Sequence, residues 1–196
     1  MKTKNTALSL ALLFTSAMVA GAQQSATGNT YKGDAAVTYQ WVRSNTQPGN
    51  CGCFYLNGGG VSGSWNVHSR WSAVADFSAV YAGDVPTTNA SLTLVSYLGG
   101  VRYRLPEIDR LHSLQPFAQG LFGGAHAGGG GAGEGDATNA FMMRIGGGLD
   151  LPLSQSFAVR LIQADYQMAT FANGSNDRQN NLLLATGLVV HWPRSR

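Results

Sequence analysis

Charged side chains are scarce in this sequence. Only 12% of the 196 residues are Asp, Glu, Lys or Arg, and Glu107 and Glu134 are the only glutamates. Helical proteins usually carry many Glu, Lys and Ala residues, whereas this chain has 26 glycines, the costliest ordinary residue in a helix. The lack of charge and the excess of glycine argue against a helical protein and predict β-structure. With 44% hydrophobic residues, the chain is also too apolar to be disordered.

Long apolar runs are absent after residue 22, so the sequence predicts no transmembrane helix there. The one marked run, Ala7–Val19, is shorter than the ~17 to 25 residues that a membrane-spanning helix needs. Lysines precede this run, and Ala20-Gly21-Ala22 follows it with the small-x-small pattern of a cleavage site. We therefore expect residues 1–22 to be a signal peptide cut after Ala22, and residues 23–196 to be a single exported domain.

Cysteine is limited to the Cys51-Gly52-Cys53 sequence. Export exposes these residues to an oxidising compartment, although a bridge between cysteines two positions apart closes a small, strained ring. Two cysteines also fall short of the four ligands of a structural zinc site. We expect either a local disulfide or two thiols here, and no metal or other cofactor.

A strong charge of either sign is missing as well. The formal net charge is +3, and two of the lysines lie in the predicted signal peptide. The sequence therefore predicts no basic patch and no nucleic-acid partner.

Strict alternation of apolar and polar residues is the main positive feature. In residues 71–81 every odd position is apolar or aromatic and Asp76 lies on the other face, with Val74 and Val80 as exceptions. Residues 141–151 alternate in the same way. Segments of about ten residues with period two are typical of membrane barrels, in which one face meets lipid and the other the lumen.

Trp71 and Tyr81 mark the ends of one such segment. At ~3.3 Å per residue and a tilt near 40°, ten residues project to roughly 25 Å along a barrel axis. This is the separation expected of two aromatic girdles.

Eight segments can be counted, and their connections alternate between compact and loose. The register stays open in 54–67 and 116–125, which are rich in glycine, and in 156–170, where Arg160 and Asp165 have opposite parity. A β-bulge would place both charges inside. We predict an all-β fold: a closed antiparallel up-and-down eight-stranded transmembrane β-barrel. The segments are 37–41, 54–67, 71–81, 95–104, 116–125, 141–151, 156–170 and 182–192.

Two segments carry a family resemblance. The final Gly187-Leu188-Val189-Val190-His191-Trp192 and the Gly99-Gly100-Val101-Arg102-Tyr103 segment resemble strands of small outer-membrane barrels, of the OmpA transmembrane-domain and OmpX/Ail kind. The resemblance covers nearly all of residues 23–196. It implies outer-membrane lipid and the barrel assembly machinery as partners, with Trp192 as the terminal residue that this machinery reads. Unlike the family's usual ending, four residues follow Trp192.

The interior of an eight-stranded barrel is only wide enough for side chains to fill it. Charges at inward positions should pair with one another, because an unpaired buried charge is costly. The expected members of this luminal charge network are Asp76, Arg102, Arg144, Asp150, Arg160 and Asp165.

The function expected from these features is a non-enzymatic outer-membrane barrel that serves envelope structure or contact through its surface loops. Scaffolded loops carry the specificity in such proteins, although the sequence names no ligand. One alternative is a soluble lipocalin-like carrier of a small apolar ligand, suggested by Gly63-Ser64-Trp65. It would place apolar residues inside and polar ones outside. A second is a lipid A-modifying barrel enzyme, for which no Ser, His and acid group can be brought together from spacing.

Overall fold

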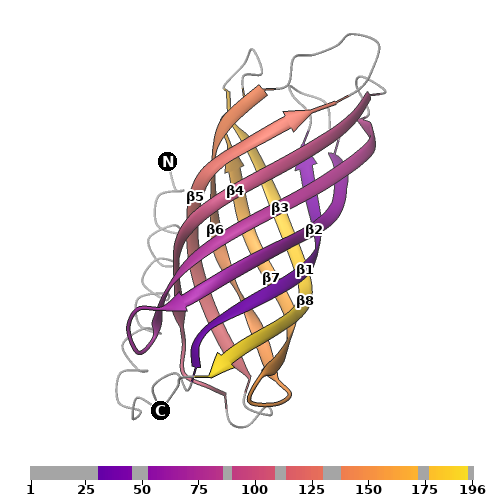
Figure 1. Ribbon diagram of the computed structural model, residues 1–196. Helices are drawn as coiled ribbons and strands as arrows, with labels where there is room; N and C mark the ends of the chain where they lie inside the picture. Colours follow the sequence, from indigo (N-terminus) through magenta and orange to yellow (C-terminus); the bar gives the residue numbers. More distant parts are fainter. Residues whose placement is uncertain are drawn as a thin grey trace, which may run out of the picture.

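The computed structural model describes residues 31–45, 53–85, 90–108, 114–129, 138–171 and 177–193. Within these ranges the chain forms eight strands (Figure 1). None of the described residues belongs to a helix with the length and apolarity needed to cross a membrane. The strands are β1 (Tyr31–Asn45), β2 (Cys53–Asn66), β3 (Trp71–Val85), β4 (Ala90–Arg104), β5 (Gln115–Gly128), β6 (Thr138–Pro152), β7 (Phe157–Ala169) and β8 (Gln179–Pro193).

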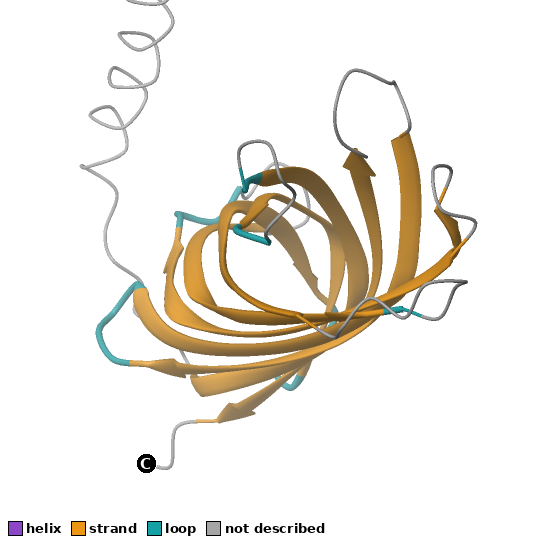
Figure 2. Cartoon of the chain, turned by 90° about the horizontal axis from the view of Figure 1, so that it is seen from above, coloured by secondary structure: helices purple, strands orange, loops and turns teal. Residues whose placement is uncertain are grey.

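Each strand pairs antiparallel with its neighbours in the sequence, and β8 pairs with β1 to close the barrel. Figure 2, seen from above, shows the strands arranged around a common centre. The predicted fold class is therefore confirmed. We call the end that carries the 67–70, 105–114 and 153–156 connections the turn end, and the opposite end the loop end.

The outer face of the wall is apolar and aromatic. In β3 exposed and buried residues alternate from Trp71 to Ala82, with Trp71 and Phe77 outside and Asp76 inside. In β6 Ile145 is 52% exposed and Arg144 only 1%. The predicted assignment of outward and inward positions is confirmed in both strands. It is the reverse of the arrangement that a soluble carrier with an apolar interior requires.

A β-bulge in β7 resolves the parity conflict between Arg160 and Asp165. Leu161 and Ile162 are both exposed and together lie opposite Thr186 of β8, so the inward positions change parity at this point. Both charges consequently point into the lumen. The Thr186 hydroxyl donates a hydrogen bond to the carbonyl oxygen of Arg160, at 2.9 Å. This bond satisfies a backbone acceptor at the irregularity, where the regular ladder is interrupted.

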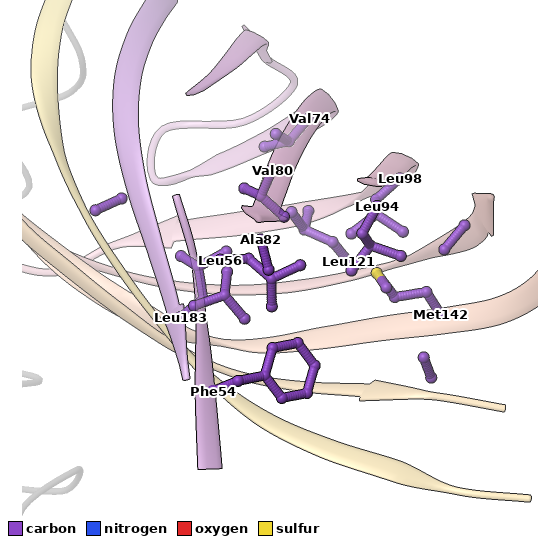
Figure 3. Close-up of a cluster of buried hydrophobic side chains, with 14 residues drawn as sticks. Phe54, Leu56, Val74, Val80, Ala82, Leu94, Leu98, Leu121, Met142 and Leu183 are labelled. Carbon is purple, nitrogen blue, oxygen red and sulfur yellow. The ribbon is translucent and has the colours of Figure 1, made fainter. Parts of the chain in front are cut away.

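The lumen has two chemically different halves, a division that the sequence analysis did not predict. Its turn-end half is mostly polar, whereas apolar side chains from all eight strands gather mostly toward the loop end. Figure 3 shows this group of buried apolar side chains. Val74 and Val80, the exceptions to the alternation of β3, belong to this group. We call it the apolar layer: Val42, Phe54, Leu56, Val74, Val80, Ala82, Leu94, Leu98, Leu121, Ala125, Met142, Ala169, Leu183 and Ala185.

Candidate functional site

The polar half of the lumen is the candidate functional site. All the charged residues that the sequence placed at inward positions are buried there, and the structure adds Asp34 and Arg104 to them. Burying so many charges is costly unless each is paired or hydrogen-bonded. The contacts between these side chains therefore determine what the site can do.

Asp34 on β1 is the acceptor for two arginines of β4. Arg102 Nη1 lies 3.3 Å from Asp34 Oδ1, and Arg104 Nη2 contacts Oδ2. The Ser64 hydroxyl of β2 donates to the same Oδ2 at 2.5 Å. This carboxylate thus ties three strands together at the turn end.

The chain of hydrogen bonds continues around the wall from β4 to β5 and β7. Arg102 donates from Nη2 to Gln119 Oε1 at 3.0 Å, and Gln119 Nε2 donates to Asp165 Oδ2 at 3.2 Å. Gln163 Nε2 donates to the same carboxylate at 2.6 Å, and its Oε1 accepts from Arg160 Nη1 at 2.9 Å.

Arg160 and Asp150 close this arrangement with a two-pronged ion pair. Arg160 Nε and Nη2 lie 2.8 and 3.1 Å from the two Asp150 oxygens, the fork geometry that makes such pairs strong. We call the connected set from Asp34 to Asp150 the lower network. Its members are Asp34, Ser64, Arg102, Arg104, Gln119, Asp150, Arg160, Gln163 and Asp165.

Aromatic rings line the lower network. The guanidinium carbons of Arg102 and Arg160 lie 4.7 and 4.6 Å from the centroid of the buried Phe117 ring. Arg104 lies 5.0 Å from the centroid of Tyr31, which stacks on His191 at 4.1 Å. Cation–π contacts of this kind are stronger where the groups are shielded from water.

A second set of contacts, the middle network, surrounds Arg144 of β6. Its Nη1 lies 2.9 Å from Asp76 Oδ1 on β3. Its Nη2 donates to Gln167 Oε1 at 3.1 Å, and reaches Ser96 Oγ at 3.3 Å and Ser78 Oγ at 3.4 Å. The two serine hydroxyls bond to each other at 2.7 Å.

Asp165 differs from the other luminal carboxylates of the described strands. Asp34, Asp76 and Asp150 each form an ion pair with an arginine, whereas Asp165, 0% exposed, accepts its hydrogen bonds from two amide groups. Four aspartates face four arginines, so the buried charges balance. The site is thus suited to holding strands together, because most of its ionisable groups are engaged with one another.

The remaining predicted residues lie apart from these networks. Ala20, Ala22 and Cys51 fall outside the described residues. Cys53 begins β2, where Arg43 Nη2 donates to its Sγ at 3.5 Å. Trp192 is exposed near the end of β8. In the described part of the chain no three His, Cys, Asp or Glu side chains come together as metal ligands.

Sequence reasoning missed Asp34 and Gln119 because it read the first strand as starting at residue 37 and the fifth as weakly patterned. Asp34 lies inward, in phase with Ala36 and Thr38, so extending the alternation backwards would have found it. Arg104 shares the parity of Arg102 and could have been included on that ground. Nothing in the sequence indicated that Phe117 lies beside two guanidinium groups.

A closed eight-stranded wall with an apolar exterior and paired charges inside defines a class of protein. It is the architecture of the small outer-membrane barrels. The chain has this fold.

Solved structures of small outer-membrane barrels superimpose on this fold. Neisserial surface protein A, NspA, superimposes with a TM-score of 0.61 at 11% identity, covering 82% of this chain and 97% of that one. The attachment invasion locus protein Ail of Yersinia pestis superimposes with a TM-score of 0.51 at 15% identity, and the match covers 81% of this chain and 99% of Ail. The N-terminal β-barrel domain of Pseudomonas aeruginosa OprF superimposes with a TM-score of 0.50 at 12% identity, and the match covers 85% of this chain and 100% of the OprF domain. No protein-family model and no curated protein sequence matches the chain.

The Asp76–Arg144 pair allows a test of the middle network. Replacing the arginine alone, Arg144→Met, leaves the Asp76 carboxylate buried without its cation and should cost about 3 to 5 kcal/mol of unfolding free energy. The double variant Asp76→Leu/Arg144→Met should lose less than the single variant, because it buries no lone charge. Urea titrations in lipid vesicles measure both, with Arg43→Met on the exposed wall as the control. Equal stability of wild type and Arg144→Met would contradict this assignment.

Proposed function

We propose that this protein is a non-enzymatic barrel of the outer membrane, whose rigid wall carries loops for envelope structure or for contact with other surfaces. The observation that carries the proposal is the distribution of side chains on the outer wall. Exposed valine, isoleucine, leucine and phenylalanine side chains cover it in a band, including Val61, Phe77, Val101, Ile145 and Leu188. Such a surface is costly in water and is stable against hydrocarbon.

Aromatic side chains flank this band at both ends, as the girdles of membrane barrels do. Trp41 stacks on Tyr55 near the loop end, with centroids 5.0 Å apart, and Trp71 packs against Tyr103 near the turn end, at 4.8 Å. The loop-end girdle consists of Tyr39, Trp41, Tyr55, Tyr81, Phe141 and Tyr166. The turn-end girdle consists of Trp65, Trp71, Tyr103, Phe157 and Trp192.

Surface contact is the role that fits the loop end. Loops on a rigid scaffold can vary without changing the wall. Among the proteins of similar fold, one is called a surface protein and another an attachment invasion locus protein, which has also been solved with the heparin analogue sucrose octasulfate. Each loop-end connection includes residues outside the described ranges, so the chemistry of a partner stays open.

The charged lumen supports a structural role over catalysis. Its arginines bond to aspartates and glutamines, and the imidazole ring of His191 stacks on the ring of Tyr31. A lipid-modifying barrel enzyme would need a nucleophile, a base and an orienting acid in mutual contact. We therefore assign the luminal charges to holding the wall together.

Export and assembly follow from the same proposal. Cleavage after Ala22 would release the exported domain, and Trp192 near the end of β8 would be the residue read by the barrel assembly machinery. Outer-membrane lipid then surrounds the finished wall.

Cell fractionation combined with gel mobility tests the membrane location. Closed barrels resist SDS until they are heated, so the protein should appear in the outer-membrane fraction and change its migration on boiling. Its mass should be that of residues 23–196. A periplasmic protein with no shift would contradict the proposal and favour the soluble carrier.

A charge placed on the lipid-facing wall tests the orientation of the faces. The change Ile145→Arg should lower the unfolding free energy in lipid vesicles by ~2 to 4 kcal/mol if this position lies near the bilayer midplane. The matched control is Leu153→Arg, in the exposed turn between β6 and β7, which should cost at most about 0.5 kcal/mol. Equal effects at both positions would show that residue 145 does not face hydrocarbon.

Single-channel recording tests whether side chains close the lumen. The wild-type barrel in a planar bilayer should show no stable open state, because the apolar layer excludes hydrated ions. The double change Leu121→Ser/Met142→Ser should produce discrete openings, whereas Val67→Ser in the β2–β3 turn should not. Sustained current through the wild type would contradict a filled lumen.

A further inference from the structure

Four buried side-chain atoms in the described part of the barrel have no hydrogen-bond partner among the protein groups, and three of them surround the middle network. They are the Nε of Arg144, the Nε2 of Gln167 and the Oε1 of Gln40. These three side chains are each 1% exposed. A buried donor or acceptor left unsatisfied costs about 1 to 3 kcal/mol, so a coincidence of three in one region points to a ligand.

Shared neighbours place the three side chains in the same region of the lumen. Arg144 Nη2 bonds to Gln167 Oε1 at 3.1 Å and reaches Ser78 Oγ at 3.4 Å. The Gln40 amide lies against Gly60, where a Cβ would collide with it and would lie 3.1 Å from the Cβ of Ser78. The absence of a side chain at Gly60 thus admits the Gln40 amide to the same layer as Arg144.

We infer that a water molecule is bound between Arg144, Gln167 and Gln40 in the middle of the barrel. The chemistry of the three free atoms selects this ligand. Arg144 Nε and Gln167 Nε2 are donors, and Gln40 Oε1 is an acceptor. Water accepts from the first two, donates to the third, and so makes the ~3 hydrogen bonds that are typical of a buried water.

Ions fit this position less well. An anion would be repelled by the partial negative charge of the Gln40 oxygen. Asp76 also already neutralises the Arg144 guanidinium, at 2.9 Å. A cation would be repelled by the positive charge of the Arg144 guanidinium group. A neutral ligand that both donates and accepts avoids both conflicts.

Placement in the fold fits the same ligand. The lower network offers polar groups from the turn end up to Asp165, whereas the apolar layer lies toward the loop end. Buried polar side chains of the described strands therefore lead from the turn end toward the middle network, where the bound molecule lies.

Nuclear magnetic resonance on the refolded, nitrogen-15-labelled full barrel tests the inference. The Arg144 Hε proton should give a direct dipolar cross-peak to water, with the sign of a long-lived complex. Arg160 and Arg102 are matched controls, because their Nε atoms donate to Asp150 at 2.8 Å and to Gln119 at 3.2 Å. Their Hε protons should show no such peak. The absence of the Arg144 peak in the folded wild type would overturn the inference.

Two variants separate a bound water from other sources of the signal. Hydroxyl protons of Ser78 and Ser96 exchange with water, so the peak must persist in Ser78→Ala/Ser96→Ala; its disappearance there would overturn the inference. Removing the acceptor in Gln40→Leu should reduce the peak to background, while the Arg160 signals show that the fold is kept. An undiminished peak in Gln40→Leu would also count against the site. If a variant fails to fold, the presence or absence of the Arg144 cross-peak in the wild type, compared with Arg160 and Arg102, decides whether the water is bound.

Discussion

Closure of the sheet is the constraint on which the rest of this structure depends. Once β8 pairs with β1, no strand edge remains and backbone hydrogen bonding is completed within the wall. The cost of closure is that every residue must face either outward or into a lumen of fixed width. One continuous wall needs apolar residues on its outer face and paired or apolar residues on its luminal face. This requirement accounts for the period-two pattern, the paired charges and the bulge of β7.

The two halves of the lumen satisfy this constraint with different physics. Near the loop end, side chains such as Leu56, Met142 and Leu183 fill space by apolar packing and leave no polar group to satisfy. Toward the turn end, guanidinium and carboxylate groups fill the same cross-section, and each must be neutralised and hydrogen-bonded. Directional bonds between distant strands fix their relative positions, which apolar packing alone does less strictly. The mixed filling therefore combines apolar packing with a defined arrangement of strands.

Much of this could be predicted from the sequence, because alternation reports directly which face a residue occupies. Arg102 and Arg144 were identified as inward residues from parity alone. Partners across the lumen could not be identified, since Asp34 and Arg102 are far apart in the sequence and meet only through the stagger of the closed barrel. In the sequence, the apolar layer shows only as apolar residues at inward positions, such as Val74 and Val80. The structure explains these residues, because one half of the lumen is filled by apolar side chains.

The bulge at Leu161 bears on how sequences of this kind should be aligned. A chain lacking this one residue would carry an uninterrupted alternation through the seventh strand, with Arg160 and the following aspartate still on the same side. A single-residue gap inside a strand, normally taken for an alignment error, is physically permitted at this position. The same gap would remove the need for a hydroxyl at position 186, so the two sites should vary together among relatives.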